Sequence, residues 1–149
     1  MKISKKIKLF SLIILLIVTS VLLLVGKTKR DVLQREIDLV FTNAISDSMS
    51  GLSMDYDKIG TEGKIRCYYQ TLYNLHDAIE VFHISSYRED KELFKTLNRL
   101  YTYILTNKRD NYEIDDKLYI FSFLGKIMFY PDDNQVISDF NSFLDSKRK

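Results

Sequence analysis

Three side chains with the chemistry of metal ligands lie close together in the middle of the chain: His76, Glu80 and His83. Residues at positions i, i+4 and i+7 of a helix share one face to within about 60°. Imidazole and carboxylate groups in this arrangement bind Zn²⁺ or another transition metal. If all three point into a helical bundle, a carboxylate from another helix could complete a mononuclear site. The simpler interpretation is that both histidines edge the core and hydrogen-bond to the backbone or to a tyrosine, so no cofactor is assigned.

Glu80 and His83 also form the Glu-x-x-His unit of di-iron helical bundles. That architecture needs two such units and two further glutamates. Because His76 and His83 are the only histidines in the chain, a symmetric di-metal site within one chain is excluded.

The stretch DYDKIGTEGKIR begins like the calcium-binding loop of an EF-hand. Asp55, Asp57 and Gly60 match positions 1, 3 and 6 of that loop. Position 5, however, is Ile59 and position 12 is Arg66, so two of the principal oxygen ligands are missing. The spacing of the glycines also differs from that of a phosphate-binding loop. The stretch is therefore predicted to be a connection between two helices.

No recognised motif for nucleophilic catalysis is present. The sequence has no Gly-x-Ser-x-Gly elbow, and its single cysteine, Cys67, is predicted to lie nearly opposite the apolar stripe of its helix. A single cysteine cannot form an internal disulfide, so Cys67 is expected to be a free thiol. No catalytic residue is assigned, and the protein is expected not to be an enzyme.

Tyrosine is abundant, with ten residues in a chain of 149. It is enriched in protein interfaces because it joins an apolar ring to a polar hydroxyl group. The tyrosines therefore form either a contact surface for another protein or a set of rings at the edge of the core. Both alternatives concern Tyr68, Tyr69, Tyr73, Tyr101 and Tyr103 in particular.

The beginning of the chain has the composition of a membrane anchor. Residues 1–8 form a basic tail, and the next 17 residues, from Leu9 to Val25, carry no charge. A helix of this length is about 26 Å long, and flanking residues can extend it toward the roughly 30 Å hydrocarbon core of a bilayer. A cleaved secretory signal is the alternative, but cleavage near the small residues would leave the apolar VLLLV run at the new amino terminus. We therefore expect a transmembrane segment at residues 9–26.

The charges around this segment favour one orientation. Four lysines and the α-amino group precede it, and Lys27, Lys29, Arg30 and Arg35 follow it. Positively charged flanks tend to stay in the cytoplasm. Moving a short tail with four lysines outward is the costlier choice. The protein is thus predicted to be a single-pass protein of the cell membrane, with a cytoplasmic amino terminus and an extracytoplasmic domain.

The remaining residues, 31–149, form an acidic domain. All 20 acidic residues but only 15 of the 22 basic residues lie there, so its net charge is about −5 although the whole chain carries +2. Such a domain lacks the basic surface of a nucleic-acid-binding protein. DNA and RNA are therefore not expected as partners, and another protein is.

The apolar residues of this domain recur at spacings of three and four, which predicts an all-α fold of four to five helices. The first helix is expected to cover residues 31–49, to continue the membrane helix as a stalk and to stop near Gly51. The second is expected to cover residues 61–84. Capping patterns predict that the later helices begin at Ser86, Asp110 and Asp132.

Residues 118–130, LYIFSFLGKIMFY, are apolar on almost every side. As a helix they would be the most buried member of the bundle. The alternative is a short hairpin that turns at Gly125 and Lys126. An isolated hairpin is marginally stable, so the helix is favoured.

These features predict a membrane-anchored, non-catalytic helical protein that binds another protein at the membrane. A subunit, an assembly factor, an inhibitor or an immunity-type protein would all have this organisation. The alternative is a membrane-tethered sensor or enzyme that holds a metal or a small ligand on the face formed by His76, Glu80 and His83.

Overall fold

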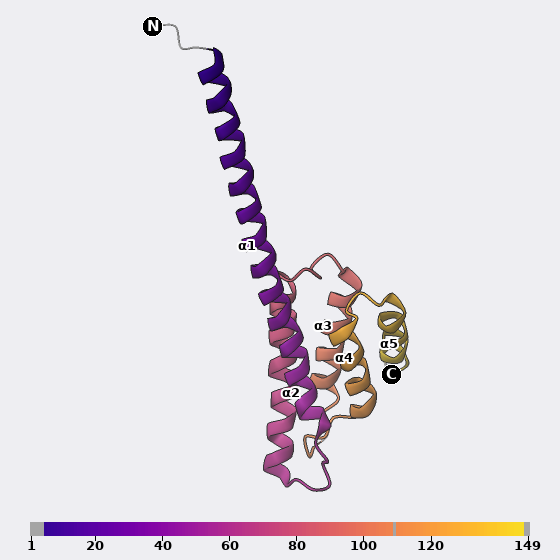
Figure 1. Ribbon diagram of the computed structural model, residues 1–149. Coiled ribbons are helices and arrows are strands. Elements are labelled where there is room, and N and C mark those ends of the chain that lie inside the picture. Colours follow the sequence, from indigo (N-terminus) through magenta and orange to yellow (C-terminus); the bar gives the residue numbers. More distant parts are fainter. Residues whose placement is uncertain (1–4, 109, 148–149) are drawn as a thin grey trace. The chain divides into compact units, whose positions relative to one another are not determined.

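The fold is all-α, as predicted (Figure 1). The computed structural model describes residues 5–108 and 110–147, with the side chains of the first helix described from Phe10 onward. These residues form five helices and no strand. The helices are α1 (Lys5–Ser53), α2 (Thr61–Phe82), α3 (Lys91–Thr106), α4 (Lys117–Phe129) and α5 (Asn134–Ser146).

The chain divides into two compact units, residues 1–36 and residues 37–149. In the first unit the described residues belong to α1 alone, and its large apolar side chains from Phe10 to Val25 are exposed. The most apolar 18-residue window of this helix has a mean hydropathy of 2.5, and none of it is buried. Among the described residues, this is the one helix that is long and apolar enough to cross a membrane.

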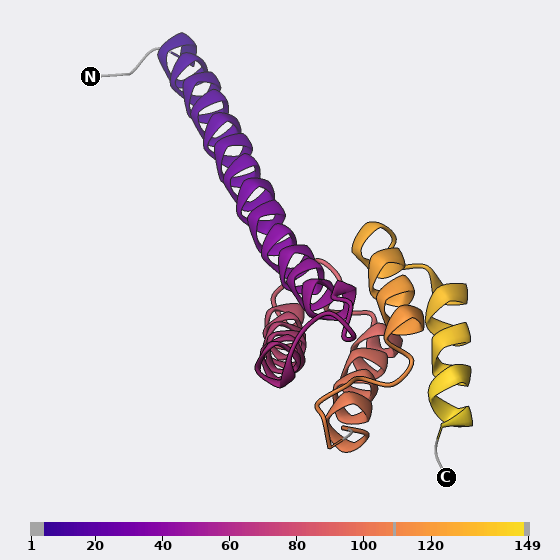
Figure 2. The same cartoon turned by 90° about the horizontal axis from the view of Figure 1, so that it is seen from below.

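Residues 37–149, here called the helical unit, share one core. Within it α3 packs against both α2 and α5, and α4 packs against α5 (Figure 2). The Phe123 and Phe140 rings stack with their centroids 3.8 Å apart, which joins α4 to α5. The largest fully buried side chains come from every helix: Phe41, Ile45, Leu52, Leu75, Phe82, Leu93, Leu97, Leu100, Ile104, Ile120, Leu124 and Phe140.

The last turns of α1 approach α2 closely at Gly51. A Cβ atom at this position would clash with the Thr71 hydroxyl group and with the Cys67 carbonyl oxygen. The Thr71 hydroxyl group lies 3.0 Å from that carbonyl oxygen and 3.2 Å from the Ser48 carbonyl oxygen, so it links the two helices. Gly51 is therefore needed for packing. The predicted helix stop at Gly51 is wrong by two residues, because α1 continues to Ser53.

Residues 118–129 belong to the single helix α4, so the hairpin alternative is wrong. The helix buries Ile120, Phe123, Leu124 and Ile127 on one side. Its other side is not covered, because Leu118 remains 75% exposed and Phe129 70% exposed. The expectation that α4 is the most buried helix is therefore also wrong.

The predicted start of α3 at Ser86 is wrong. The helix is capped by Asp90, whose carboxylate accepts a hydrogen bond of 2.9 Å from the Leu93 backbone amide. Ser86 has a different role: its backbone amide and hydroxyl group donate to the Asp38 carboxylate of α1 at 2.8 and 2.7 Å. Ser86 thus makes a tertiary contact with α1 and does not serve as the cap of α3.

The next two helices also begin later than predicted. Residues near Asp110 are not helical, because Ile114 is buried and pairs with Lys108 in an isolated antiparallel bridge. The α5 cap is shifted by one residue from Asp132 to Asp133. Its carboxylate accepts hydrogen bonds of 3.0 and 3.1 Å from the backbone amides of Gln135 and Val136.

Replacing Gly51 by Ala should lower the free energy of unfolding by about 3 kcal/mol, because the new methyl group forces α1 away from α2. Urea titration of the full chain in mild detergent, followed by the near-ultraviolet circular dichroism of the tyrosines, measures this change. Gly60→Ala is the matched control: its Cβ would meet nothing within 4 Å, and the backbone φ is −69°. Equal midpoints for the two variants would contradict the close approach at Gly51.

Candidate functional site

His76, Glu80 and His83 lie on one exposed stripe of α2. The His76 Nε2 and Glu80 Oε1 atoms are 3.9 Å apart, and the two side chains are 52% and 68% exposed. The His83 ring lies at the carboxyl end of the helix, with its centroid 4.7 Å from that of Phe94. The three side chains therefore do not point into the bundle, as the metal alternative would require. Both histidines lie at the edge of the core, next to the rings of Tyr101 and Phe94. The buried face of α2 is centred on Leu75, and the stripe is rotated from it by about 110°.

A metal site on this stripe remains a prediction. Among the described residues, no group of three or more His, Cys, Asp or Glu side chains is arranged to hold a metal ion. His76 and Glu80 supply a pair of neighbouring ligand groups, while the His83 ring packs against an aromatic ring of α3.

The same stripe continues toward the amino end of α2 with exposed tyrosines. Tyr69 and Tyr73 are 39% and 66% exposed, and their rings stack with centroids 5.7 Å apart and planes 23° apart. On the α3 side, the Tyr101 ring lies 5.8 Å from the His76 ring. We use the name tyrosine surface for the group formed by Tyr69, Tyr73, His76, Tyr101 and Tyr112. It gathers three of the ten tyrosines from two helices, and a fourth from the connection that follows α3.

Tyr112 completes this surface from a left-handed backbone conformation, with φ of 64°. A non-glycine residue in this region costs roughly 1–2 kcal/mol. Its ring is held by aromatic neighbours, with centroid distances of 5.7 Å to Tyr68 and 6.1 Å to Tyr69. The Lys108 ammonium group lies 4.2 Å above the same ring. The strain is thus offset by contacts that fix the edge of the tyrosine surface.

The five tyrosines singled out in the sequence have different positions. Tyr68 is a core residue, 2% exposed. Tyr69, Tyr73 and Tyr101 lie on the tyrosine surface. Tyr103 lies on the far side of α3, where its hydroxyl group donates a hydrogen bond of 2.8 Å to the Asp116 carboxylate. Tyr68 is therefore a core ring, whereas a contact surface for another protein remains a prediction for the exposed tyrosines.

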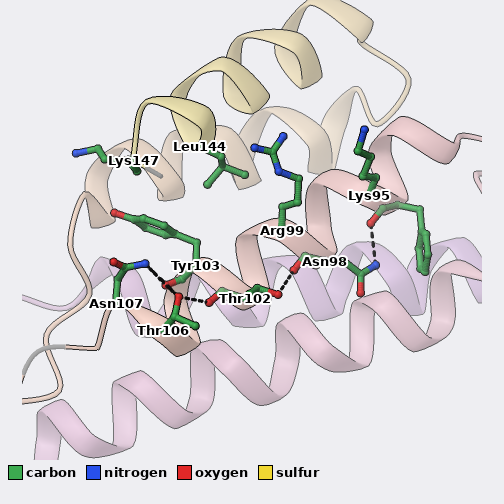
Figure 3. Close-up of a pocket in the computed structure, with 10 residues that line it drawn as sticks. Lys95, Asn98, Arg99, Thr102, Tyr103, Thr106, Asn107, Leu144 and Lys147 are labelled. Carbon is green, nitrogen blue, oxygen red and sulfur yellow. Dashed lines mark hydrogen bonds between the residues drawn. The ribbon is translucent and has the colours of Figure 1, made fainter. Parts of the chain in front are cut away.

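A depression of about 590 Å³ lies on this far side, between α3 and the carboxyl end of α5 (Figure 3). Its cationic side chains are already paired. Arg99 donates to the Asn141 side-chain oxygen at 2.6 Å and to the Asp145 carboxylate. The Lys147 ammonium group lies 2.8 Å from the Asp116 carboxylate. These cations are therefore neutralised within the chain.

Two threonines of the depression bond to their own helix. Thr102 donates to the Asn98 carbonyl oxygen at 2.9 Å, and Thr106 donates to that of Thr102 at 2.7 Å (Figure 3). Burial, followed by the hydrogen bond to Asp116, raises the pKa of Tyr103, so this hydroxyl group keeps its proton. Asp, Glu, His, Cys and Ser are all absent from the ten residues that line the depression.

A second depression, of about 630 Å³, contains the acidic part of the DYDKIG stretch. Lysines are interleaved with its carboxylates: Lys58 lies 2.9 Å from Asp55, and Lys64 lies 2.6 Å from Glu113. The hydrogen bond with Lys58 is the main cause that lowers the pKa of Asp55. Residues 54–60 connect α1 to α2, as the sequence predicts. The carboxylates that line this depression are Asp55, Asp57, Glu113, Asp115 and Asp116.

Tyr56 and Cys67 are buried beside this connection, and the sequence did not identify Tyr56. The predicted position of Cys67 opposite the core is wrong: it is a free thiol that is only 6% exposed, because its turn of α2 faces Gly51. Tyr56 is 7% exposed, and its buried hydroxyl group has no hydrogen-bond partner of good geometry among the described residues. The Lys117 ammonium group lies 3.9 Å above the Tyr56 ring.

No known protein family, curated protein or solved structure matches this chain.

Replacing Tyr56 by Phe should keep or raise the free energy of unfolding at neutral pH, by up to about 1 kcal/mol, since a buried hydroxyl group without a partner is removed. Burial raises the pKa of Tyr56 to about 12 from an ordinary value of 10. The folded state therefore retains the proton between these pH values while the unfolded chain loses it. The wild type should lose about 2 kcal/mol more than the variant from pH 10 to pH 12.

Urea titrations of both proteins across this pH range measure the difference. Comparing the two proteins cancels the titration of the other tyrosines. A constant difference in the free energy of unfolding from pH 7 to pH 12 would contradict the burial of the Tyr56 hydroxyl group.

Proposed function

We propose that this chain is a single-pass membrane protein whose helical unit acts without catalysis by binding another protein at or near the membrane. The long apolar part of α1 supports the anchor, since its window of mean hydropathy 2.5 has no buried residue. The tyrosine surface carries the binding proposal. Its exposed tyrosines are Tyr69 and Tyr73, whose rings stack on each other, and Tyr73 is 66% exposed. Tyr101 and Tyr112 are half-buried at its edge.

The chemistry of the tyrosine surface suits a protein partner. Tyrosine contributes large contact area at low cost in conformational entropy, and it is enriched where interfaces bury a few dominant residues. The rings are held in place before binding, because Tyr69 contacts Tyr68, Tyr73 and Tyr112. Glu80 and Lys108 supply charges at the edge of the surface. This combination of an aromatic centre and a polar rim is typical of protein interfaces.

The proposed orientation places the amino terminus in the cytoplasm and the helical unit outside. Four lysines in the short tail support it, because translocating them is unfavourable. A subunit, an assembly factor, an inhibitor and an immunity-type protein all remain consistent with such an anchored binding unit. What they share is a partner that is present at the membrane.

A photo-crosslinking amino acid at Tyr73 should give an adduct of defined mass in native membranes, because this side chain lies in the centre of the proposed contact. The same group at Ser142, which is exposed on α5, is the matched control and should give none. With the purified partner, Tyr73→Ala should weaken binding by about 10-fold or more. The same adduct from both positions, or none from Tyr73, would argue against the tyrosine surface.

Protease added to intact cells should digest the helical unit and spare a tag on the amino terminus. Replacing the four lysines of residues 1–8 by Gln should invert a fraction of the molecules, because the remaining positive charges follow the apolar segment. Replacing Lys27, Lys29 and Arg30 by Gln should leave the orientation unchanged. Survival of the helical unit until the cells are lysed would reverse the proposed orientation.

A further inference from the structure

We propose that the tyrosine surface recognises a basic segment of its protein partner, with arginine or lysine side chains bound at the carboxyl-terminal half of α2. The inference rests on the proposed function, because it names the chemistry of the partner at the same surface. Two carboxylates, those of Asp77 and Glu80, follow Tyr73 in this half of the helix. We call these two residues the acidic flank.

The acidic flank and the exposed tyrosine lie on one stripe of α2. Asp77 and Glu80 follow Tyr73 by four and seven residues, so the three side chains share one face of the helix to within about 60°. Tyr73 is 66% exposed, the Glu80 side chain is 68% exposed, and Asp77 is also exposed. A partner segment that covers the Tyr73 ring therefore approaches both carboxylates.

The negative charge of the acidic flank is poorly balanced within the helical unit. No hydrogen bond or ion pair links Asp77 to another described residue. Glu80 faces the His76 imidazole at 3.9 Å, which is longer than a hydrogen bond. Further back on the same stripe, Arg66 lies seven residues before Tyr73 and pairs with Glu62 at 3.8 Å.

The end of α2 adds to this negative potential. The last turn of the helix contains no basic residue, although cations are the favourable charges near a helix carboxyl terminus. Glu80 lies in that turn, so its carboxylate is placed where the helix dipole disfavours it. A cation from a partner would relieve this unfavourable arrangement.

The Tyr73 ring offers a face to such a cation. The Tyr69 ring stacks on it with planes 23° apart and covers one face. By the register of the helix, Asp77 lies on the side of the other face, one turn further on. A guanidinium or ammonium group above that face is attracted by the ring and by the carboxylate together. The chain makes the same kind of contact internally, since the Lys108 ammonium group lies 4.2 Å above the Tyr112 ring.

The neighbouring stripe of α3 is uncharged. The helix packs against α2 (Figure 2), and its Tyr101 ring lies 5.8 Å from the His76 ring. Leu105, one turn after Tyr101, is 50% exposed. Arginine and lysine bury their aliphatic stems along such apolar surface and keep the charged group beside a carboxylate. This combination suits a long basic side chain.

A defined basic peptide tests the recognition directly. The purified full chain in non-ionic detergent is titrated into fluorescein-labelled tetra-arginine amide, and binding is followed by fluorescence anisotropy. Removing the charges with Asp77→Asn/Glu80→Gln, or the ring with Tyr73→Ala, should weaken binding by about 10-fold. The matched control, Asp47→Asn/Asp139→Asn, removes the same charge from exposed positions of α1 and α5 and should change binding less than about 2-fold. Added salt should weaken the wild-type complex.

Two results would overturn the inference. Equal weakening by the two double variants would show a general attraction to an acidic chain, and no binding of tetra-arginine by the wild type would remove the recognition altogether. All of the substituted side chains are exposed, and far-ultraviolet circular dichroism checks that each variant keeps its helices.

The photo-crosslink from position 73 in native membranes separates this inference from the proposed function. Its yield should fall about 10-fold when Asp77→Asn/Glu80→Gln is added and should persist with Asp47→Asn/Asp139→Asn. An unchanged yield with both pairs would leave the protein partner in place and overturn its basic character. No adduct even without these substitutions would overturn the proposed function, and the basic segment with it.

Discussion

The close approach of α1 and α2 at Gly51 is the contact on which the helical unit depends. Because no side chain separates the two backbones there, the Thr71 hydroxyl group reaches the Ser48 carbonyl oxygen and Cys67 turns inward. Further along the same pair of helices, the Phe41 and Phe82 rings meet at 6.0 Å. This crossing sets the rotation of α2 about its axis. A rotation by one residue, about 100°, would bury the stripe that now carries tyrosine and histidine.

The parts of the fold that the sequence predicts well are those that depend on local apolar spacing. The spacing predicts the second helix over residues 61–84, and it covers Thr61–Phe82. The helix at residues 118–130 is predicted for another reason, the marginal stability of an isolated hairpin, and α4 is observed at Lys117–Phe129. Helix starts were predicted less well, since a capping pattern competes with tertiary partners. Ser86 has the residue type of a cap but bonds to Asp38, which lies 48 positions earlier in the chain. Such a partner leaves no local signal.

The candidate site was predicted only in part, because one amphipathic residue type has two possible roles. Tyr69 fits the apolar spacing of α2, yet it is 39% exposed, while its neighbour Tyr68 is 2% exposed. If Tyr69 is counted as an apolar residue, the predicted buried face of α2 turns toward His76 and away from Cys67. Gly51 on the opposing helix determines which face of α2 is buried, since it gives Cys67 room to be buried. His76, Glu80 and His83 thus share one face, as predicted, but this face of α2 is exposed and is not part of the core.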